Sequence, residues 1–289
     1  MEIVTLRLFI TLARHLHFGK TSDLMHMSPS AVSRALQRLE DQLGHRLLTR
    51  DNRSAELTAA GRIFLEYALD SVKRWEALEQ ELQDQSSVLQ GQLSMFASVT
   101  ASQSILPRVL AGFRQQYPDI HIQLETGYAV NALSKLKEGI DVVVAALSDD
   151  EDEYLLKRII TSIPIRSVVP AGGDYHHRLI RDQVDWSSIP LVLPSTGPVR
   201  SSVDAWLKEN KVSPNVYAEV PGNEAILSLV ALGCGVGFVP ELVVAGSPLA
   251  SQVSMVEVGP ELQDFHVGFC TLRKNYEVSS IVRAFWAAI

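Results

Sequence analysis

The sequence of 289 residues lacks any long uninterrupted run of apolar residues. No stretch approaches the roughly 18 apolar residues that a membrane-spanning helix needs. The N-terminal segment carries Glu2, Arg7 and Arg14 within its apolar pattern, whereas a secretion signal places its basic residues before an unbroken apolar core. We therefore expect a protein of the cytoplasm with no membrane partner.

Cysteine is scarce, and the chain contains only Cys234 and Cys270. Neither belongs to a Cys-x-x-Cys pair or to a Cys/His cluster. This scarcity excludes a disulfide-rich scaffold and a structural zinc site, and it predicts two buried, reduced thiols. The eight histidines form no metal-ligand spacing either, so we expect neither a metal nor a cofactor.

Familiar catalytic motifs are also missing from the sequence. It contains no Gly-x-Ser-x-Gly elbow, no His-Glu-x-x-His pair, no phosphate-binding loop and no Gly-x-Gly-x-x-Gly between a strand and a helix. The glycine-rich segment 233–237 follows an expected helix and precedes an expected strand, so it predicts a tight turn instead of a phosphate cradle. These absences argue against an enzyme.

The overall composition is that of an ordinary globular protein, with 46% hydrophobic and 20% charged residues. The length suggests two or three domains. The net charge of −7 is unevenly spread, because residues 1–60 hold eight basic and six acidic residues while the remainder holds 18 and 27. A mildly basic N-terminal part on an acidic body is compatible with local binding to nucleic acid.

The N-terminal part predicts three short helices. Helical spacing of apolar residues indicates a first helix over residues 5–16, and a second helix fits residues 20–25, entered through Gly19. A third helix should begin at Pro29, which suits the first helical position, with Ser28 as its N-cap. We expect this helix to run to Leu43 and to end at Gly44.

The third helix has two different faces. Its apolar stripe is formed by Val32, Ala35, Leu36, Leu39 and Leu43, and a polar stripe at the same spacing is formed by Ser30, Ser33, Arg34 and Gln37. No carboxylate interrupts the polar stripe, and its hydroxyls, amide and guanidinium can form hydrogen bonds with base edges and phosphates. This pattern predicts a DNA-reading helix, although a plain three-helix core with a solvated face remains an alternative.

The next stretch predicts a β-hairpin. Residues 46–50 form one expected strand, 51–54 the turn and 55–58 the return strand. Arginines at its tip suit contact with phosphates or the minor groove, and the order of elements is that of a winged helix-turn-helix. The expected DNA-binding residues are Ser28, Pro29, Ser30, Ser33, Arg34, Gln37, Arg38, Arg50 and Arg53.

A long helix should follow over residues 59–88, where there is no proline and Gly61 is the only glycine. At ~1.5 Å per residue it would span ~45 Å, too long to be covered by a small N-terminal domain. Burial against a second copy would produce a symmetric dimer with two DNA-binding domains, whereas packing on its own body is the alternative. The expected apolar stripe comprises Leu65, Ala68, Leu69, Val72, Trp75, Leu78 and Leu82.

The remaining residues alternate short apolar strands with helices, which predicts an α/β fold in two lobes. We place the boundaries at 1–58 for the DNA-binding domain, 59–90 for the linker helix and hinge, and 91–289 for the ligand-binding domain. Within the last of these, the first lobe should comprise about 91–163 and 268–289, and the second lobe about 164–267.

Three strand-to-helix junctions at residues 98–102, 195–200 and 222–224 suit a polar or anionic small molecule, because hydroxyls and free backbone N–H groups gather there. Arg200 is the one cation among them, so it is the candidate partner of a ligand carboxylate. Ordinary helix caps are the alternative. The expected ligand-binding residues are Ser98, Thr100, Ala101, Ser102, Thr196, Gly197, Val199, Arg200, Asn223 and Glu224.

Several of these segments together resemble the LysR-type transcriptional regulators. The resemblance is carried by segments 9–13, 17–19, 28–34, 39–44, 47–50 and 57–61. It implies a winged helix-turn-helix, a dimerising linker helix and a two-lobed effector domain like the type 2 periplasmic binding proteins. It further implies a homodimer or tetramer that binds double-stranded promoter DNA and contacts RNA polymerase. Ser22, Leu24 and Leu48 depart from the usual family pattern, but none of them is an expected base-reading residue.

A second set of segments, 98–101, 197–200, 210–212 and 231–236, resembles the branch of this family that controls acetohydroxyacid isomeroreductase in isoleucine and valine synthesis. This resemblance implies acetolactate or acetohydroxybutyrate as the effector, activation of a neighbouring biosynthetic gene and repression of the regulator's own gene. Two alternatives stay open: a repressor that needs no effector, and an enzyme or solute-binding module built on the same lobes.

Overall fold

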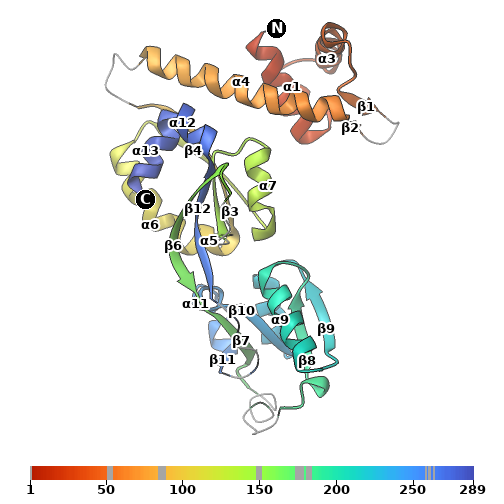
Figure 1. Ribbon diagram of the computed structural model, residues 1–289, viewed down its shortest axis with the longest axis vertical. Coiled ribbons are helices and arrows are strands. Elements are labelled where there is room, and N and C mark those ends of the chain that lie inside the picture. The colour runs from red at the N-terminus through yellow and green to blue at the C-terminus, as the bar shows by residue number, and fades with distance from the viewer. Residues whose placement is uncertain are drawn as a thin grey trace. The chain divides into compact units, whose positions relative to one another are not determined.

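The computed structural model describes residues 2–50, 55–83, 89–147, 152–172, 179, 184–257, 259, 262 and 264–289. The chain divides into two compact units (Figure 1). The first unit comprises Met1–Gly91, Lys137–Gly139 and Lys274–Ala287, and the second comprises Gln92–Leu136, Ile140–Arg273 and Ala288–Ile289.

Three helices open the first unit: α1 (Ile3–His15), α2 (Phe18–Leu24) and α3 (Pro29–Leu43). The bounds expected for α3 are confirmed, because the Ser28 hydroxyl accepts a hydrogen bond from the Ala31 N–H and Gly44 ends the helix with a φ of 69°. Helix α2 begins two residues before the expected position. Its first turn is capped by His17, whose ring Nδ1 accepts a hydrogen bond from the Lys20 N–H.

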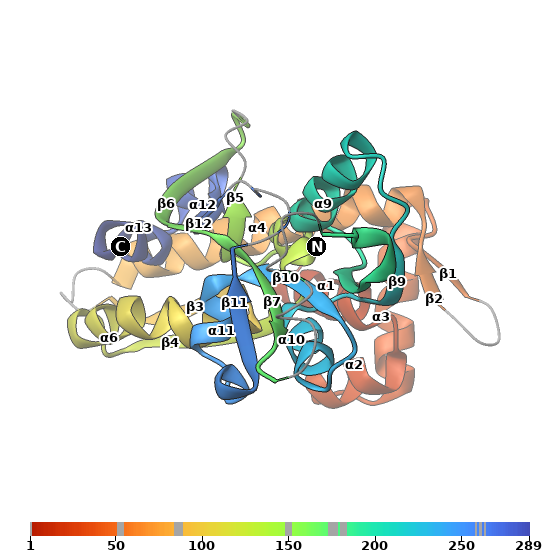
Figure 2. The same ribbon diagram turned by 90° about the horizontal axis from the view of Figure 1, so that it is seen from below.

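A hairpin follows, formed by β1 (Leu48–Arg50) and β2 (Ala55–Leu57), and Figure 2 shows it projecting beside the helices. The two strands are antiparallel, with Leu48 opposite Leu57 and Arg50 opposite Ala55. The chain therefore contains the expected wing, although its turn at residues 51–54, including Arg53, lies outside the described residues.

The long helix α4 (Ala59–Gln83) is buried on one side within its own unit. Phe64, Ala68 and Val72 join the core formed by α1 and α3, and the rings of Phe9 and Phe64 meet edge to face at 5.1 Å. The expectation that the whole apolar stripe faces a second copy is therefore wrong for its first half. In the second half Trp75, Leu78 and Leu82 are exposed.

The second unit contains two five-stranded sheets, each of which forms one lobe (Figure 1). The first sheet has the order β4-β3-β5-β12-β6, and the second has the order β11-β7-β10-β8-β9. The strands of the first lobe are β3 (Gly91–Ser98), β4 (Ile120–Gly127), β5 (Val142–Leu147), β6 (Leu155–Ile163) and β12 (Phe265–Leu272). Those of the second lobe are β7 (Ile165–Pro170), β8 (Pro190–Pro194), β9 (Asn215–Val220), β10 (Val236–Pro240) and β11 (Val253–Val256).

The chain crosses twice between the lobes, once from β6 to β7 and again when β12 returns to the first sheet. Strand β12 lies between β5 and β6 and is antiparallel to both. The sequence did not predict β6, because its half-buried side chains do not alternate clearly between apolar and polar residues.

Helices link the strands in both lobes. The bounds are α5 (Val99–Ser104), α6 (Leu106–Gln116), α7 (Ala132–Lys137), α9 (Pro198–Glu209), α10 (Asn223–Ala231), α11 (Glu241–Ala245), α12 (Arg273–Val278) and α13 (Ser280–Ala288), with single 3-10 turns η1 (Ala129–Asn131), η2 (Trp186–Ser188) and η3 (Ala250–Gln252). The apolar spacing of the sequence predicts a helix over residues 203–208, but α9 begins five residues earlier, at Pro198. Gly197 has a φ of 101° and Pro198 takes the first helical position, so Arg200 belongs to the first helical turn.

Among the described residues, no helix combines the length and the apolar character that crossing a membrane would require.

Both cysteines are free, but their surroundings differ. Cys270 on β12 is fully buried, and this burial raises the pKa of its thiol to about 11. Cys234 is only half-buried, which corrects the expectation of two buried thiols.

We expect only Cys234 to react with an aromatic disulfide reagent at neutral pH in the native protein, because the buried Cys270 offers no accessible thiolate. Both thiols should react in denaturant. The absorbance of the released thiolate counts them, and Cys234→Ser should abolish the native reaction. Rapid native reaction of two thiols would contradict the burial of Cys270.

Candidate functional sites

The polar stripe of α3 is largely exposed to solvent. Ser30, Arg34, Gln37 and Arg38 are exposed, Ser33 is half-buried, and the opposite face buries Val32, Leu36 and Leu39. Ser28 is exposed as well, and its hydroxyl lies 3.1 Å from that of Ser30 while it caps the helix. The structure thus places the expected base-reading side chains on one open surface, which the acids Glu40 and Asp41 border at its C-terminal end.

Glu40 joins this helix to the wing, a role that the sequence did not reveal. Its Oε1 accepts hydrogen bonds from the backbone N–H groups of Leu47 and Leu48, at 2.8 and 3.2 Å. The carboxylate is therefore engaged by the backbone that leads into β1. A polar groove of about 520 Å³ lies beside this contact, and its lining includes Ser33, Gln37 and Arg46.

The base of the wing is also tied to the start of α4. The Thr58 hydroxyl donates to the Arg46 carbonyl at 2.7 Å and accepts a hydrogen bond from the Gly61 N–H at 2.9 Å. The Thr58 N–H donates to the Leu47 carbonyl at 3.0 Å. These contacts hold the recognition helix, the wing and the long helix in one arrangement.

The second unit contains a cavity of about 320 Å³ between its two lobes. Helices α9 and α10 of the second lobe both begin at this cavity, and so does α5 of the first lobe. The structure thereby brings together the three strand-to-helix junctions that the sequence singled out. The predicted residues that line it are Ser98, Thr100, Thr196, Gly197, Val199, Asn223 and Glu224.

Two further predicted residues lie close to this cavity. Ala101 lines an adjoining cavity of about 50 Å³, and its N–H donates to the hydroxyl of Ser98. Ser102 lines neither cavity, and its hydroxyl donates to the Val99 carbonyl at 2.7 Å. The Ser98 and Ser102 hydroxyls thus also stabilise the first turns of α5.

A hydrogen bond connects the two lobes across the cavity. The Thr100 hydroxyl of the first lobe donates to Oε1 of Glu224 in the second lobe at 2.5 Å. Nearby, a Cβ on Gly222 would lie 3.4 Å from the Tyr128 ring, which is an ordinary van der Waals contact. The lining is otherwise mostly apolar or small, and it includes Val99, Val130, Ala146, Pro194, Pro198, Pro221 and Pro240.

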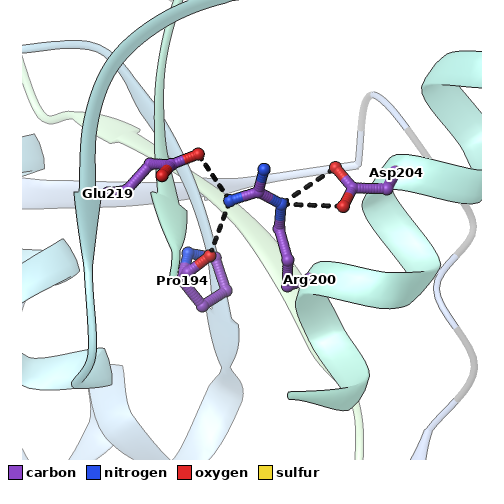
Figure 3. A network of polar contacts seen from close by, with 4 residues as sticks. All are labelled: Pro194, Arg200, Asp204 and Glu219. Atoms are coloured by element: carbon purple, nitrogen blue, oxygen red, sulfur yellow. Dashed lines mark hydrogen bonds and ion pairs between the residues drawn. The ribbon is translucent and has the colours of Figure 1, made fainter. Parts of the chain in front are cut away.

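Arg200 is engaged outside the cavity lining, in the network that Figure 3 shows. Its Nε donates to the Asp204 carboxylate at 2.8 and 2.9 Å, and its Nη1 donates to Glu219 at 2.7 Å and to the Pro194 carbonyl at 3.1 Å. The hydrogen bonds with Glu219 and then with Asp204 raise the pKa of the guanidinium, against the opposing effect of burial. The geometry thus ties the start of α9 to the ends of β8 and β9, and Arg200 as the partner of a ligand carboxylate remains a sequence prediction.

Within the part of the chain that the structure describes, no three His, Cys, Asp or Glu residues are grouped so that they could hold a metal ion.

Comparison with known proteins identifies both units. Residues 3–62 match the family model for the bacterial regulatory helix-turn-helix protein of the lysR family, and residues 86–289 match the LysR substrate binding domain. The chain is 37% identical to the HTH-type transcriptional activator IlvY of Haemophilus influenzae, over the full length of both chains. It is 35% identical to the HTH-type transcriptional regulator IlvY of Escherichia coli (strain K12), over 99% of this chain and 98% of the relative.

A solved structure shows the same fold. Full-length CbnR complexed with its target DNA matches 100% of this chain and 99% of its own, with a TM-score of 0.65 and 21% sequence identity.

Proposed function

Because the chain belongs to the LysR family of bacterial regulatory helix-turn-helix proteins, we propose that it binds a promoter as a homodimer or tetramer and responds to a small organic acid. Membership of the family makes it a DNA-binding transcriptional regulator and not an enzyme.

The open polar face of α3 carries the proposal for DNA binding. It presents hydroxyls, an amide and the guanidinium of Arg34, with the acids Glu40 and Asp41 only at its C-terminal end, and the wing lies beside it. We propose that α3 enters the major groove, where Arg34 reads a base edge, and that the wing arginines Arg50 and Arg53 contact the DNA backbone or the minor groove.

We expect Arg34→Ala to cost about 1–3 kcal/mol of binding to the specific promoter fragment and to relax its sequence preference, if Arg34 reads a base. Arg53→Ala should instead weaken binding to all duplexes alike and lower the slope of affinity against salt concentration by about one. Fluorescence anisotropy with specific and scrambled fragments at several salt concentrations measures both effects. Unchanged affinity in both variants would remove α3 and the wing as the DNA-contacting surface.

The interlobe cavity carries the proposal for an effector. At about 320 Å³ it is near the lower end of the ~300–1,000 Å³ typical of ligand sites, which suits a small acid. The identity to the IlvY proteins supports acetolactate or acetohydroxybutyrate as the ligand, together with activation of a branched-chain amino acid biosynthesis gene. Repression of its own gene, contact with RNA polymerase and action in the cytoplasm belong to the same proposal.

Regulation requires that the acid bind one arrangement of the lobes better than another. The lobes are joined by two crossing segments and by the Thr100–Glu224 hydrogen bond. Because residues of both lobes line the cavity, a ligand bound there contacts both lobes at once. Such contacts would shift the population of lobe arrangements, and the long helix would transmit that shift to the DNA-binding domains.

Footprinting of the DNA upstream of a neighbouring gene, with and without acetolactate, tests this function. We expect protection of a partly palindromic site and a changed pattern when the acid is added. Protection that no small acid alters, together with no ligand-induced change in melting temperature, would favour a repressor without an effector. Turnover of the acid would instead favour an enzyme.

A further inference from the structure

Glu224 is the one formally charged side chain among the described residues that line the interlobe cavity. It lies in the first turn of α10 and is exposed to the cavity and to solvent. Within the part of the lining that the structure describes, no lysine or arginine accompanies it. A carboxylate at this position strongly affects which acids can enter, because like charges repel in a confined site.

The contact with Thr100 shows that Glu224 accepts a hydrogen bond from a hydroxyl group. Its hydroxyl donates to Oε1 of Glu224 at 2.5 Å, from the opposite wall of the cavity. Ionised carboxylates act only as acceptors, so a ligand that approaches Glu224 closely must also offer a donor. A ligand hydroxyl offers the same O–H geometry as the threonine.

We propose that Glu224 selects the ligand by accepting a hydrogen bond from its hydroxyl group, in competition with Thr100. This inference rests on the proposed function of the cavity as the effector site. The ligand class is then a 2-hydroxy monocarboxylate, because every carboxylate of a ligand is repelled by Glu224 and a dicarboxylate of similar shape, with two, is bound less well.

The exchange also changes the contact between the lobes. When the ligand hydroxyl occupies the Glu224 carboxylate, the Thr100 hydroxyl loses its partner there and can turn to another acceptor on the ligand. A direct bond between the lobes is thereby replaced by a bridge through the ligand, which gives the two states different interlobe contacts.

The hydroxyl contact is tested by calorimetric titration of the full-length protein with two acids. Acetolactate carries the hydroxyl, and 2,2-dimethyl-3-oxobutanoate has a methyl group in its place. We expect the wild type to bind acetolactate at least about tenfold more tightly than the methyl analogue. Losing a hydrogen bond to a charged acceptor typically lowers affinity by about this factor. In Glu224→Ala this preference should disappear.

The charge effect is tested with citramalate, a 2-hydroxy-2-methyl acid that carries a second carboxylate. We expect the wild type to reject citramalate, whereas Glu224→Gln should bind it about tenfold more tightly than the wild type does. Glu209→Gln, at the exposed end of α9, removes one charge from the same lobe outside the cavity and should leave the selectivity unchanged. An unchanged circular dichroism spectrum and melting temperature of each variant show that its second unit is folded.

The outcomes separate this proposal from the proposed function. If acetolactate binds the wild type and the Glu224 variants with the same preferences, Glu224 does not select the ligand, although the effector assignment stands. If the wild type binds DNA specifically but does not bind acetolactate, both the effector and the role of Glu224 are wrong. Tight binding of citramalate to the wild type also overturns the charge argument.

Discussion

Gly61→Ala should destabilise the DNA-binding unit by about 3 kcal/mol and abolish specific DNA binding. A Cβ at this position would lie 2.0 Å from the Leu47 carbonyl oxygen and 3.0 Å from its carbon. Both atoms belong to the backbone, so no side chain can turn aside to make room. The start of α4 would have to move away from the base of the wing, and the Thr58 hydrogen bonds would be lost.

Gly112→Ala provides a matched control for this substitution. Gly112 lies inside α6, and a Cβ there would have nothing within 4 Å. Alanine should therefore stabilise the protein by roughly 0.5–1 kcal/mol, through the helix propensity alone. Urea unfolding followed by circular dichroism measures the free energy of unfolding of both variants. A Gly61→Ala protein as stable as the wild type would show that the wing and α4 are not packed as described.

Local signals explain why the bounds of α3 could be predicted. Ser28, Pro29 and Gly44 mark its two ends, and the apolar spacing between them is regular. Gly197 and Pro198 mark the start of α9 in a similar way, but the sequence prediction followed the apolar residues after them and therefore began the helix too late. The error matters, because it put Arg200 in a loop when it lies on a helix.

The site could be predicted only in part. Each strand-to-helix junction is visible in the sequence, yet their meeting at one cavity depends on how two sheets separated along the chain face each other. The surroundings of Arg200 depend in the same way on the pairing of β8 with β9, which brings Glu219 within 2.7 Å. The role of Glu40 could not be predicted for a related reason, since its partners at Leu47 and Leu48 reach it only after the chain has turned into the wing.

The second half of α4 is the part of the long helix that its own unit leaves uncovered. Its exposed apolar residues include Leu78 and Leu82, with exposed fractions of 45% and 71%. Ile63 and Tyr67 are exposed as well, at 72% and 54%, and at 3.6 residues per turn they fall with Leu78 and Leu82 within an arc of about 100° around the helix. Such a stripe is typical of a face that packs against a second copy.

We expect Leu78→Glu combined with Leu82→Glu to convert the protein from a dimer to a monomer and to weaken binding to a complete promoter site by about 100-fold or more. Two added carboxylates on each helix would bring like charges together at the interface. In a dimer, the second DNA-binding domain engages its half-site at a high effective concentration. This effect typically raises affinity by a factor of about 10²–10⁴, and a monomer loses it. Binding to an isolated half-site should hardly change, because α3 and the wing are untouched.

Sedimentation velocity at micromolar concentration and anisotropy with complete and half sites measure the two effects together. Tyr154→Glu, at an apolar residue with an exposed fraction of 78% in the second unit, adds a carboxylate away from α4 and should leave both unchanged. If the double variant remains a dimer with full affinity, α4 does not hold the copies together. A monomer that still binds the complete site tightly would instead show that one copy suffices for recognition, so the link from assembly to affinity would fail even though the interface is correct.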